Sequence, residues 1–550
     1  MLRRPWRTVA LLSTFTGSSA YLYYRYTRPA RPETFDLTVR SKPGPDGRRT
    51  STMRKVPLLS MSEVNMRIMR LATLQSHPRP GGIVWKHATA QLASNDPIED
   101  AHAALVTERD PASGAYASDG DYLFFAVMDG HSGVHTSRIL SKTLIPAVAL
   151  QLHQLSTSPN SLSQQETNKS YLSFFNSIKS LIGFTPPEHS ASLGKPSDAD
   201  PAYVSLAIQN AFAMVDAEIV GAPLRIIAEH LVQSKSKMTD TPLDLSQHPM
   251  ALPSMLPALS GSCALFALLD TANRDLYIAC TGDCRAVAGV WEDAPDGTGT
   301  WRVEVLSEDQ TGRNPNELKR LARVFLDGNH QKIRYPAPDF KTPPYVTAQP
   351  VITHRKLDFL PLSQSSEPSP LSNASPLSSS PSLSVLPTPP EAQSAPRPTL
   401  RFVILATDGL WDELSSQDAV ALVGAHLSGL RAPVISRATL AARAPTRLGT
   451  AGVEGKNKSS KKNSEDGHPW AFVDANPSAH LIRNAFGGGD TRRLRQLLSI
   501  PAPHSRRYRD DVTVTVVWWE DGRAAESRQE TLKLGVVDVT GGVVKAKAKL

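Results

Sequence analysis

The sequence places acidic residues at the ends of several apolar runs, where a buried carboxylate needs a positive partner. Asp129 follows the apolar run of residues 123–128 without a break, in LFFAVMDGHSG. The other acidic residues of this kind are Glu99 and Asp100 in NDPIEDAH, Asp283 in CTGDCRA, Asp408 in ATDGLWDE, and Asp510 and Asp511 in YRDDVTV. A single Asp-Gly pair is most often an ordinary turn. Repeated beside apolar strands, these residues predict a set of carboxylates that converge at one end of a sheet.

Carboxylates gathered in this way repel one another unless a divalent cation neutralises them. Ligation by oxygen alone favours hard ions, Mg²⁺ or Mn²⁺, over zinc or copper. Glycine follows Asp129 and Asp408 directly, so the backbone can turn sharply there, and the Gly130 carbonyl is a further candidate ligand. The spacing therefore predicts a hard-metal centre.

Six runs rich in β-branched, aromatic or small apolar residues are expected to form the strands that carry these acids: AHAALVT, YLFFAVMD, CALFALLD, DLYIACTGD, RFVILATDG and DVTVTVVWW. Between them, residues 136–153 and 203–220 repeat apolar positions three or four apart, which is typical of amphipathic helices. Strands mixed with long helices favour an α+β domain of packed layers.

Composition shifts divide the chain. We expect a targeting segment over 1–32, a linker over 33–83, one domain over 84–520 and a C-terminal extension over 521–550. Within the domain, three segments are expected to be disordered insertions, of which the Ser/Pro segment has a composition that cannot bury enough apolar surface to order itself. They are the Ser- and Gln-rich residues 154–200, the Ser/Pro residues 363–398, and residues 431–468, which contain KNKSSKKNSEDG.

The charge is concentrated at the N-terminus. The formal net charge is +8, but residues 1–32 hold six arginines and no acid, which leaves +2 for the rest of the chain. That balance argues against nucleic-acid binding. Three cysteines are too few for a disulfide framework and indicate a reducing compartment; Cys280 and Cys284 are expected to pack in the core.

An arginine-rich, acid-free start with Ser and Thr among apolar residues is typical of a mitochondrial presequence. Its uncharged stretch, residues 9–24, is shorter than the roughly 20 residues of a spanning helix. A simple membrane anchor and a disordered basic tail are the alternatives. We expect import into mitochondria, to the matrix or in association with the inner membrane.

Six motifs carry a resemblance to a known family. PIEDAHA, FFAVMDGHSG, SGSCALFALL, CTGDCRAV, LATDGLWDE and RDDVTVTVV resemble, in the same order, the motifs of the metal-dependent protein serine/threonine phosphatases of the protein phosphatase 2C family. QLASNDPIED and TPPYVTAQPVITH are more similar to the mitochondrial branch, the pyruvate dehydrogenase phosphatases and their fungal relatives. The resemblance implies a four-layer α-β-β-α sandwich with two Mg²⁺ or Mn²⁺ ions at one end.

The resemblance also implies a role for each residue. Asp129 would bridge both ions. The residues that would complete the metal sites are Glu99 and the Gly130 carbonyl for one ion, Asp408 and Asp510 for the other, and Asp283 with Asp408 for a third, weaker one. Asp100 would orient the attacking water, and His131 would be the general acid that protonates the leaving alkoxide. His135 and His354 are expected to lie at the surface or in packing.

The sequence departs from the family pattern in two places. Many members carry a phosphate-binding arginine at the position of Asn95. The mitochondrial branch commonly has asparagine there, as this chain does. Between DQTGRNPNELKRLAR and TPPYVTAQPVITH, the family's arginine-bearing strand pair is not recognisable, and the chain has VFLDGNHQKIRYPAPDFK over 324–341. A piece missing from the gene model and a genuine loss both remain open.

The function expected is that of a mitochondrial protein serine/threonine phosphatase with a monomeric catalytic domain. Its implied substrate is a phosphorylated protein, the E1 component of pyruvate dehydrogenase. The alternative is a catalytically impaired scaffold on the same fold that binds phosphoproteins. A hydrolase of small phosphate esters fits the long insertions poorly.

Overall fold

The computed structural model describes residues 33–40, 51–78, 83–108, 120–157, 199–235, 248–294, 298–312, 314–317, 347–357, 399–449 and 467–521. The expected targeting segment, the Ser/Pro segment and the unrecognised segment over 324–341 lie outside these residues. Among the described residues, no helix has both the length and the apolar character needed to cross a membrane.

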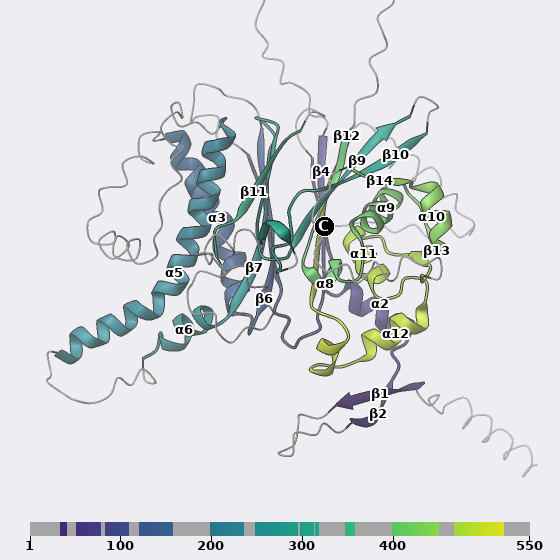
Figure 1. Ribbon diagram of the computed structural model, residues 1–550, viewed down its shortest axis with the longest axis horizontal. Helices are drawn as coiled ribbons and strands as arrows, with labels where there is room; N and C mark the ends of the chain where they lie inside the picture. Colours follow the sequence, from purple (N-terminus) through teal and green to yellow (C-terminus); the bar gives the residue numbers. More distant parts are fainter. Residues whose placement is uncertain are drawn as a thin grey trace, which may run out of the picture.

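Two β-sheets form the centre of the molecule (Figure 1). The seven-stranded sheet has the order β14 (Thr446–Leu448), β10 (Gly299–Val305), β9 (Arg285–Asp293), β12 (Thr399–Ala406), β16 (Val512–Asp521), β4 (Ile83–Leu92) and β3 (Thr73–Pro78). The five-stranded sheet has the order β11 (Val351–Lys356), β8 (Asp275–Thr281), β7 (Gly261–Asp270), β6 (Asp121–His131) and β5 (Ala101–Glu108). Neighbours are antiparallel except β10 and β14.

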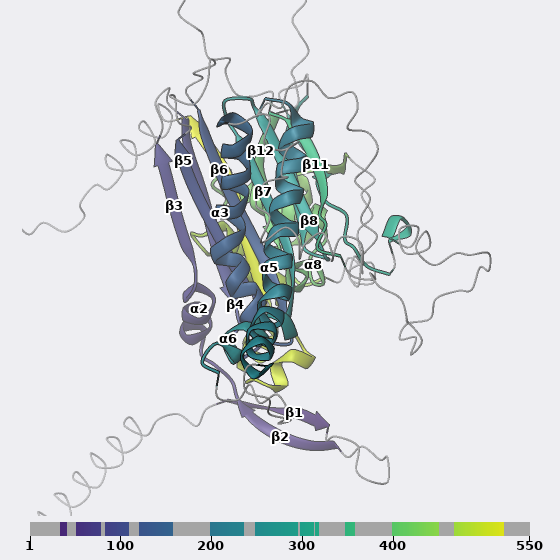
Figure 2. The ribbon, with the colours of Figure 1, turned by 90° about the vertical axis from the view of Figure 1, so that its left-hand side faces the viewer.

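Helices cover the outer face of each sheet, as Figures 1 and 2 show from two sides. Over the five-stranded sheet lie α3 (His135–Thr157), α5 (Pro201–Lys235) and α6 (Ala251–Leu259). Over the seven-stranded sheet lie α2 (Met61–Met69), α8 (Asp408–Trp411), α9 (Ser416–Leu427), α10 (Arg437–Arg443), α11 (Pro477–Ala485) and α12 (Thr491–Ser499). The four-layer α-β-β-α sandwich is therefore confirmed.

Alternation along β6 decides where its last residues point. Phe124 and Met128 pack in the core beneath α3 and α5, whereas Phe125 and Val127 pack between the two sheets. Because successive side chains of a strand point to opposite faces, Asp129 continues the face of Val127, toward the other sheet. The apolar run thus carries the aspartate to the end of the inter-sheet core.

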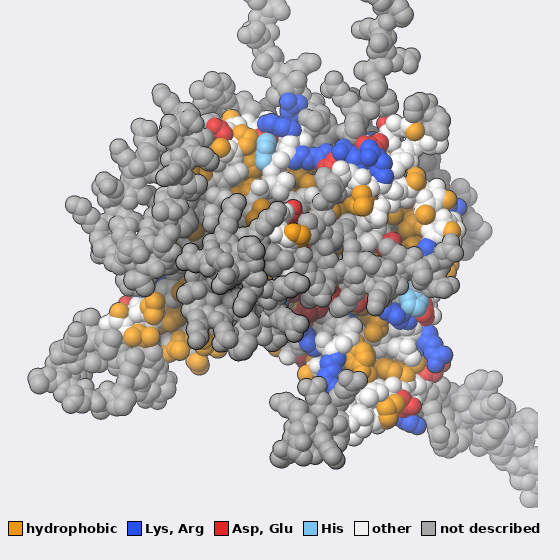
Figure 3. Space-filling model, viewed as in Figure 1, with side chains coloured by type: hydrophobic (Ala, Val, Ile, Leu, Met, Phe, Trp, Pro, Cys, Tyr) orange, Lys and Arg blue, Asp and Glu red, His pale blue; other side chains and the backbone are white. Residues whose placement is uncertain are grey.

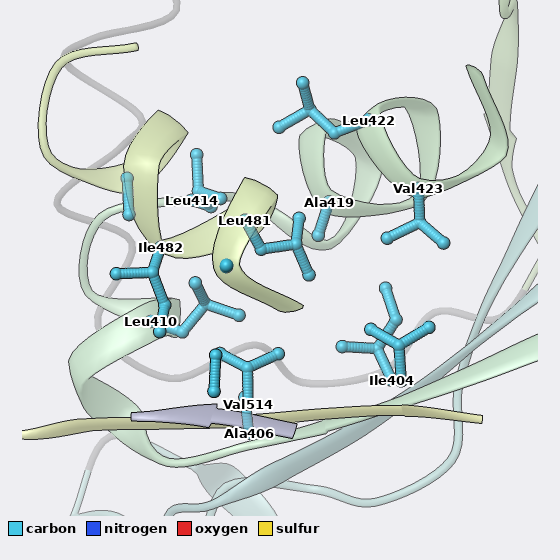
Figure 4. Close-up of a cluster of buried hydrophobic side chains, with 14 of the residues drawn as sticks. Ile404, Ala406, Leu410, Leu414, Ala419, Leu422, Val423, Leu481, Ile482 and Val514 are labelled. Carbon is cyan, nitrogen blue, oxygen red and sulfur yellow. The ribbon is translucent and has the colours of Figure 1, made fainter. Parts of the chain in front are cut away.

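A third core packs α8, α9 and α11 on the seven-stranded sheet. Figure 4 shows Leu410 and Leu414 beside Leu481, over Ile404 of β12 and Val514 of β16. Leu410 belongs to the single helical turn α8, which starts at Asp408. This packing fixes the start of α8, and so the backbone of Asp408.

The segment expected to be a linker, 33–83, is folded over much of its length. It contains β1 (Thr34–Arg40), β2 (Ser51–Pro57), α2 and β3. Ser60 and Glu63 form a capping box at the start of α2, and Val64 and Ile68 of that helix are fully buried in the core on the seven-stranded sheet. The linker expectation is therefore wrong for α2 and β3.

The expected insertion over 431–468 also contains ordered structure. The short strand β13 (Ala432–Ile435) pairs with β15 (Trp470–Phe472), and α10 and β14 follow β13. Ile435 and Leu440 are buried in the core around α9, because this part of the segment closes that side of the sandwich. Only residues 450–466 of it lie outside the described ranges.

One ion pair, between β10 and β11, joins the two sheets, and others lie beside it within the seven-stranded sheet. Figure 3 shows the Lys and Arg side chains gathered over this region, with acidic side chains among them. Arg302 lies 2.9 Å from Glu292 and 2.6 Å from Glu304, and Arg355 of β11 pairs with Glu304 of β10. These mixed charges compensate one another, in keeping with the small net charge of residues 33–550.

Candidate metal centre

Three of the acidic residues expected to bind metal lie together. Asp129 ends β6, Asp283 lies in the turn between β8 and β9, and Asp408 follows β12 as the first residue of α8. One carboxylate oxygen from each lies within 4.8 Å of the other two. Asp129 is 4% exposed, whereas Asp283 and Asp408 are partly exposed. The group is therefore buried on one side and open on the other.

The surroundings of Asp129 disfavour an uncompensated negative charge on its carboxylate. Burial, followed by repulsion from Asp100, Asp408, Asp283 and Asp510, raises the pKa of Asp129 to about 10. Its Oδ2 atom is buried and has no hydrogen-bond partner among the described residues. A buried carboxylate oxygen without a partner is costly, so a cation at this position would relieve both the repulsion and the missing contact.

Asp100 is held by two threonines, one directly after β12 and one in β16. Its Oδ2 accepts hydrogen bonds from the hydroxyl groups of Thr407, at 3.0 Å, and Thr513, at 2.8 Å. Burial and the charge of Asp511 raise the pKa of Asp100 well above its usual range. Asp100 is thus fixed beside Asp129 but outside the group of three carboxylates.

Glu99 lies in the β4–β5 loop. Its Oε1 accepts a hydrogen bond from the Gly133 N–H at 2.8 Å, and its Oε2 accepts one from Asn95 Nδ2 at 3.0 Å. Its own carbonyl lies so close to Gly130 that a Cβ there would come within 2.1 Å of it. Gly130 therefore allows the end of β6 to approach the Glu99 backbone.

Asp510 lies near the group but is engaged elsewhere. It pairs with Arg506, and its Oδ1 accepts a hydrogen bond from the Asp511 N–H at 2.7 Å. Burial raises its pKa. Glu99 and Asp510 are not within the 4.8 Å group, so the structure brings together Asp129, Asp283 and Asp408 but leaves these two at its margin.

Asp511 is a residue of the site to which sequence reasoning gave no role. It is 2% exposed, and its carboxylate accepts from the backbone N–H groups of Ser94, Asn95 and Glu99 and from Asn95 Nδ2. Asp511 therefore holds the β4–β5 loop that carries Glu99 and Asp100. The Asp-Asp pair in YRDDVTV was the signal, since two adjacent carboxylates directly before an apolar strand each need a partner.

His131 is the most accessible side chain of the site. Its side chain is 49% exposed, and its Nδ1 lies 3.6 Å from Asp129 Oδ1.

His135 lines a cavity of about 520 Å³ beside the centre, together with Asn95, Asp96, Pro97, Glu99, Gly133, Val134, Ala502 and Pro503. His354 lies away from the site, with its Nε2 2.6 Å from Asp275 Oδ1. Cys280 and Cys284 are buried in the inter-sheet core, as expected.

Comparison with known proteins identifies the family. A model of the protein phosphatase 2C family matches residues 228–332 and 370–446. A protein phosphatase 2C homolog of Schizosaccharomyces pombe is 31% identical over 454 residues, which cover 80% of this chain and 81% of that protein.

Two other proteins are similar over comparable lengths. The mitochondrial pyruvate dehydrogenase (acetyl-transferring) phosphatase 1 of Saccharomyces cerevisiae is 27% identical over 495 residues, which cover 80% of this chain and 69% of that one. The crystal structure of a serine-threonine phosphatase 2C from Toxoplasma gondii aligns with 82% of this chain and 99% of its own, at 16% identity and a TM-score of 0.35. By its similarity to the S. pombe homolog, the chain belongs to the protein phosphatase 2C family, and it is a metal-dependent protein serine/threonine phosphatase.

Proposed function

We propose that the chain hydrolyses phosphoserine and phosphothreonine in proteins with two Mg²⁺ or Mn²⁺ ions bound at the end of the sandwich. The observation that supports this best is the close group of Asp129, Asp283 and Asp408, with one buried oxygen of Asp129 unpartnered. A donor set made only of carboxylate and carbonyl oxygens fits these ions. When bound, they would lower the pKa of a water and neutralise the phosphoryl oxygens.

Each residue has a separate task in this proposal. Asp129 would help to hold both ions, Glu99 and the Gly130 carbonyl would complete one site, and Asp408 and Asp510 would complete the other. Asp283 and Asp408 would hold a third, weaker ion. Glu99 and Asp510 lie at the margin of the carboxylate group, and we expect their side chains to turn inward when metal binds.

The proton movements are assigned to two residues. Asp100, fixed by Thr407 and Thr513, orients the attacking water through a hydrogen bond. His131 donates a proton to the oxygen of the leaving serine or threonine. An exposed imidazole at the rim can reach a substrate side chain, and a protonated imidazole can donate to its leaving oxygen.

The physiological substrate we propose is the phosphorylated E1 component of pyruvate dehydrogenase, in mitochondria. Two observations support it: the relative from S. cerevisiae is a mitochondrial pyruvate dehydrogenase phosphatase, and residues 1–32 are rich in arginine and free of acid. We propose that the protein lies in the mitochondrial matrix, either free in solution or associated with the inner membrane.

The test is phosphate release by the purified protein from a phosphoserine peptide of the E1 component, with an unrelated phosphoserine peptide in parallel. We expect activity that requires Mg²⁺ or Mn²⁺, stops with chelator and is lost in Asp129→Asn. Asp275→Asn, a buried aspartate far from the centre, is the matched control and should keep metal-dependent activity. Activity unaffected by chelator would contradict the proposal, and equal rates on both peptides would remove the support for the E1 substrate.

A further inference from the structure

A cysteine lies directly opposite Asp129 in the five-stranded sheet. Strands β6 and β7 are antiparallel, and their register pairs Asp129 with Cys263 and His131 with Gly261. Residues opposite each other in a ladder share a face, and so do residues two apart on one strand. Asp129, His131 and Cys263 therefore point to the same side, at the open end of the sandwich.

These three side chains already have their donor atoms close together. A carboxylate oxygen of Asp129, a ring nitrogen of His131 and Cys263 Sγ lie within 4.8 Å of one another. The Asp129 side chain is 6% exposed, and its Oδ2 is buried without a partner among the described residues. Cys263 is partly buried and His131 is exposed, so a solute can approach from the rim.

The donor set differs in chemistry from the carboxylate group beside it. Mg²⁺ and Mn²⁺ bind oxygen ligands, whereas an oxygen, an imidazole nitrogen and a thiolate sulfur suit Zn²⁺, which takes all three at about 2.0–2.3 Å. Three protein ligands leave one tetrahedral position for water or substrate. We propose that Asp129, His131 and Cys263 form a second metal site, selective for Zn²⁺ and similar thiophilic ions, that inhibits the phosphatase.

Inhibition follows from the residues that the two sites share. Asp129 belongs to both groups, so a zinc ion bound to it competes with the hard ions. Cys263 Sγ also lies 3.4 Å from Asp283 Oδ1 and donates a hydrogen bond to it. Zinc binding replaces the thiol proton, which passes to the buffer, and so breaks this contact with a second carboxylate of the hard-metal group. This part of the inference rests on the proposed function; the binding site itself does not.

The sulfur is held in place by the neighbouring turn. Gly282 has a φ of +103°, and a Cβ at this residue would lie 2.3 Å from Cys263 Sγ. The turn between β8 and β9 therefore packs directly on the sulfur. Cys280 and Cys284 lie in the inter-sheet core and belong to no metal-ligand group among the described residues, which makes them matched controls.

Binding is tested first, with the full chain and without hard metals. Co²⁺ is the spectroscopic probe, because a thiolate ligand gives it an intense ultraviolet charge-transfer band. We expect the band in the wild type and in Cys280→Ser, and its loss in Cys263→Ser. Zn²⁺ affinity by calorimetry should fall at least about tenfold in Cys263→Ser, since removing even an indirect partner of a metal ligand costs 10–100-fold.

Inhibition is tested second, at fixed Mn²⁺ and relative to the zinc-free rate of each variant. The Zn²⁺ concentration for half inhibition should rise at least about tenfold in Cys263→Ser and stay unchanged in Cys280→Ser. Cys284→Ser replaces Cys280→Ser if thermal unfolding shows that the latter is destabilised. A missing thiolate band, or equal zinc affinity in wild type and Cys263→Ser, would overturn the site. Zinc binding through Cys263 in a protein without Mn²⁺-dependent activity would instead refute the proposed function and leave the zinc site standing.

Discussion

Asn95 Nδ2 lies 3.0 Å from Asp511 Oδ2 and donates a hydrogen bond to it, across 416 positions of sequence. The same amide group donates to Glu99 Oε2. Asn95, one of the places where the sequence departs from the expected family pattern, therefore connects the loop of Glu99 with the start of β16.

Replacing Asp511 should affect metal binding more than substrate binding. In Asp511→Asn the carboxylate loses one of its acceptor oxygens, so the β4–β5 loop that carries Glu99 loosens. We expect the Mn²⁺ concentration for half-maximal activity to rise about tenfold, with little change in KM, and stability to fall by about 1–3 kcal/mol. A Mn²⁺ titration and urea unfolding measure both. Asp293→Asn, at the exposed end of β9, is the control. A change in KM alone would show that Asp511 acts on substrate.

The metal-free protein should become less stable as pH rises. The folded-state pKa of Asp129 is about 10, above the unfolded value near 4, so the folded chain binds more protons in between. The contribution of Asp129 to the free energy of unfolding therefore falls between about pH 4 and 10. At pH 8 in chelator, Asp129→Asn should be more stable than wild type by about 2 kcal/mol. Urea unfolding at several pH values tests this; a wild type more stable than the variant at pH 8 would contradict it.

A methyl group at Gly130 should disable the site. The added Cβ would meet the Glu99 carbonyl at 2.1 Å, so either β6 or the β4–β5 loop must move. We expect Gly130→Ala to lower kcat at least about 100-fold, because small displacements of reacting groups are costly. Gly312→Ala is the control, since a Cβ there has nothing within 4 Å. Equal activity in the two variants would show that the close approach of Gly130 to the Glu99 carbonyl is not needed for catalysis.

The loss of rate on replacing His131 should increase with the basicity of the leaving group. If His131 protonates the leaving oxygen, His131→Ala should slow hydrolysis of a phosphoserine peptide by about 10²–10⁴-fold. A p-nitrophenyl ester, whose leaving group needs no proton, should slow far less. The ratio of the two rates is the measurement, and each substrate serves as a control for the other. An equal loss on both substrates would point to metal or phosphate binding instead.

The segment before residue 80 should contribute to the stability of the whole domain. Ile68 of α2 is fully buried, and Ile68→Ala should cost about 2–5 kcal/mol in the free energy of unfolding. Met66, 62% exposed on the same helix, provides the control Met66→Ala, for which we expect less than about 0.5 kcal/mol. Urea unfolding compares them. Equal changes in the free energy of unfolding of the two variants would mean that the packing of α2 does not stabilise the domain.

The sequence was sufficient for the family, the layers and the convergence of Asp129, Asp283 and Asp408. Each of these acids follows a strongly apolar strand or lies in a tight turn, so local pattern locates it. Asp511 was missed because its partners, Ser94, Asn95 and Glu99, are brought to it only by the pairing of β16 with β4.

Two other features were recognised only in the tertiary structure. The place of Cys263 beside Asp129 depends on the register of β6 and β7, which no local pattern specifies. Helix α2 did have a local signal: Ser60 and Glu63 have the spacing of a capping box, and Val64 and Ile68 are four residues apart. This short apolar stripe was not recognised because polar residues surround it in the sequence. It belongs to the core because α2 packs on the seven-stranded sheet.

The most direct test of the two-metal proposal is anomalous diffraction from crystals grown with Mn²⁺. We predict two strong peaks at the end of the sandwich, both in contact with the Asp129 carboxylate, with Glu99 and the Gly130 carbonyl on one ion and Asp408 and Asp510 on the other. A single ion, or ions that do not touch Asp129, would contradict the account.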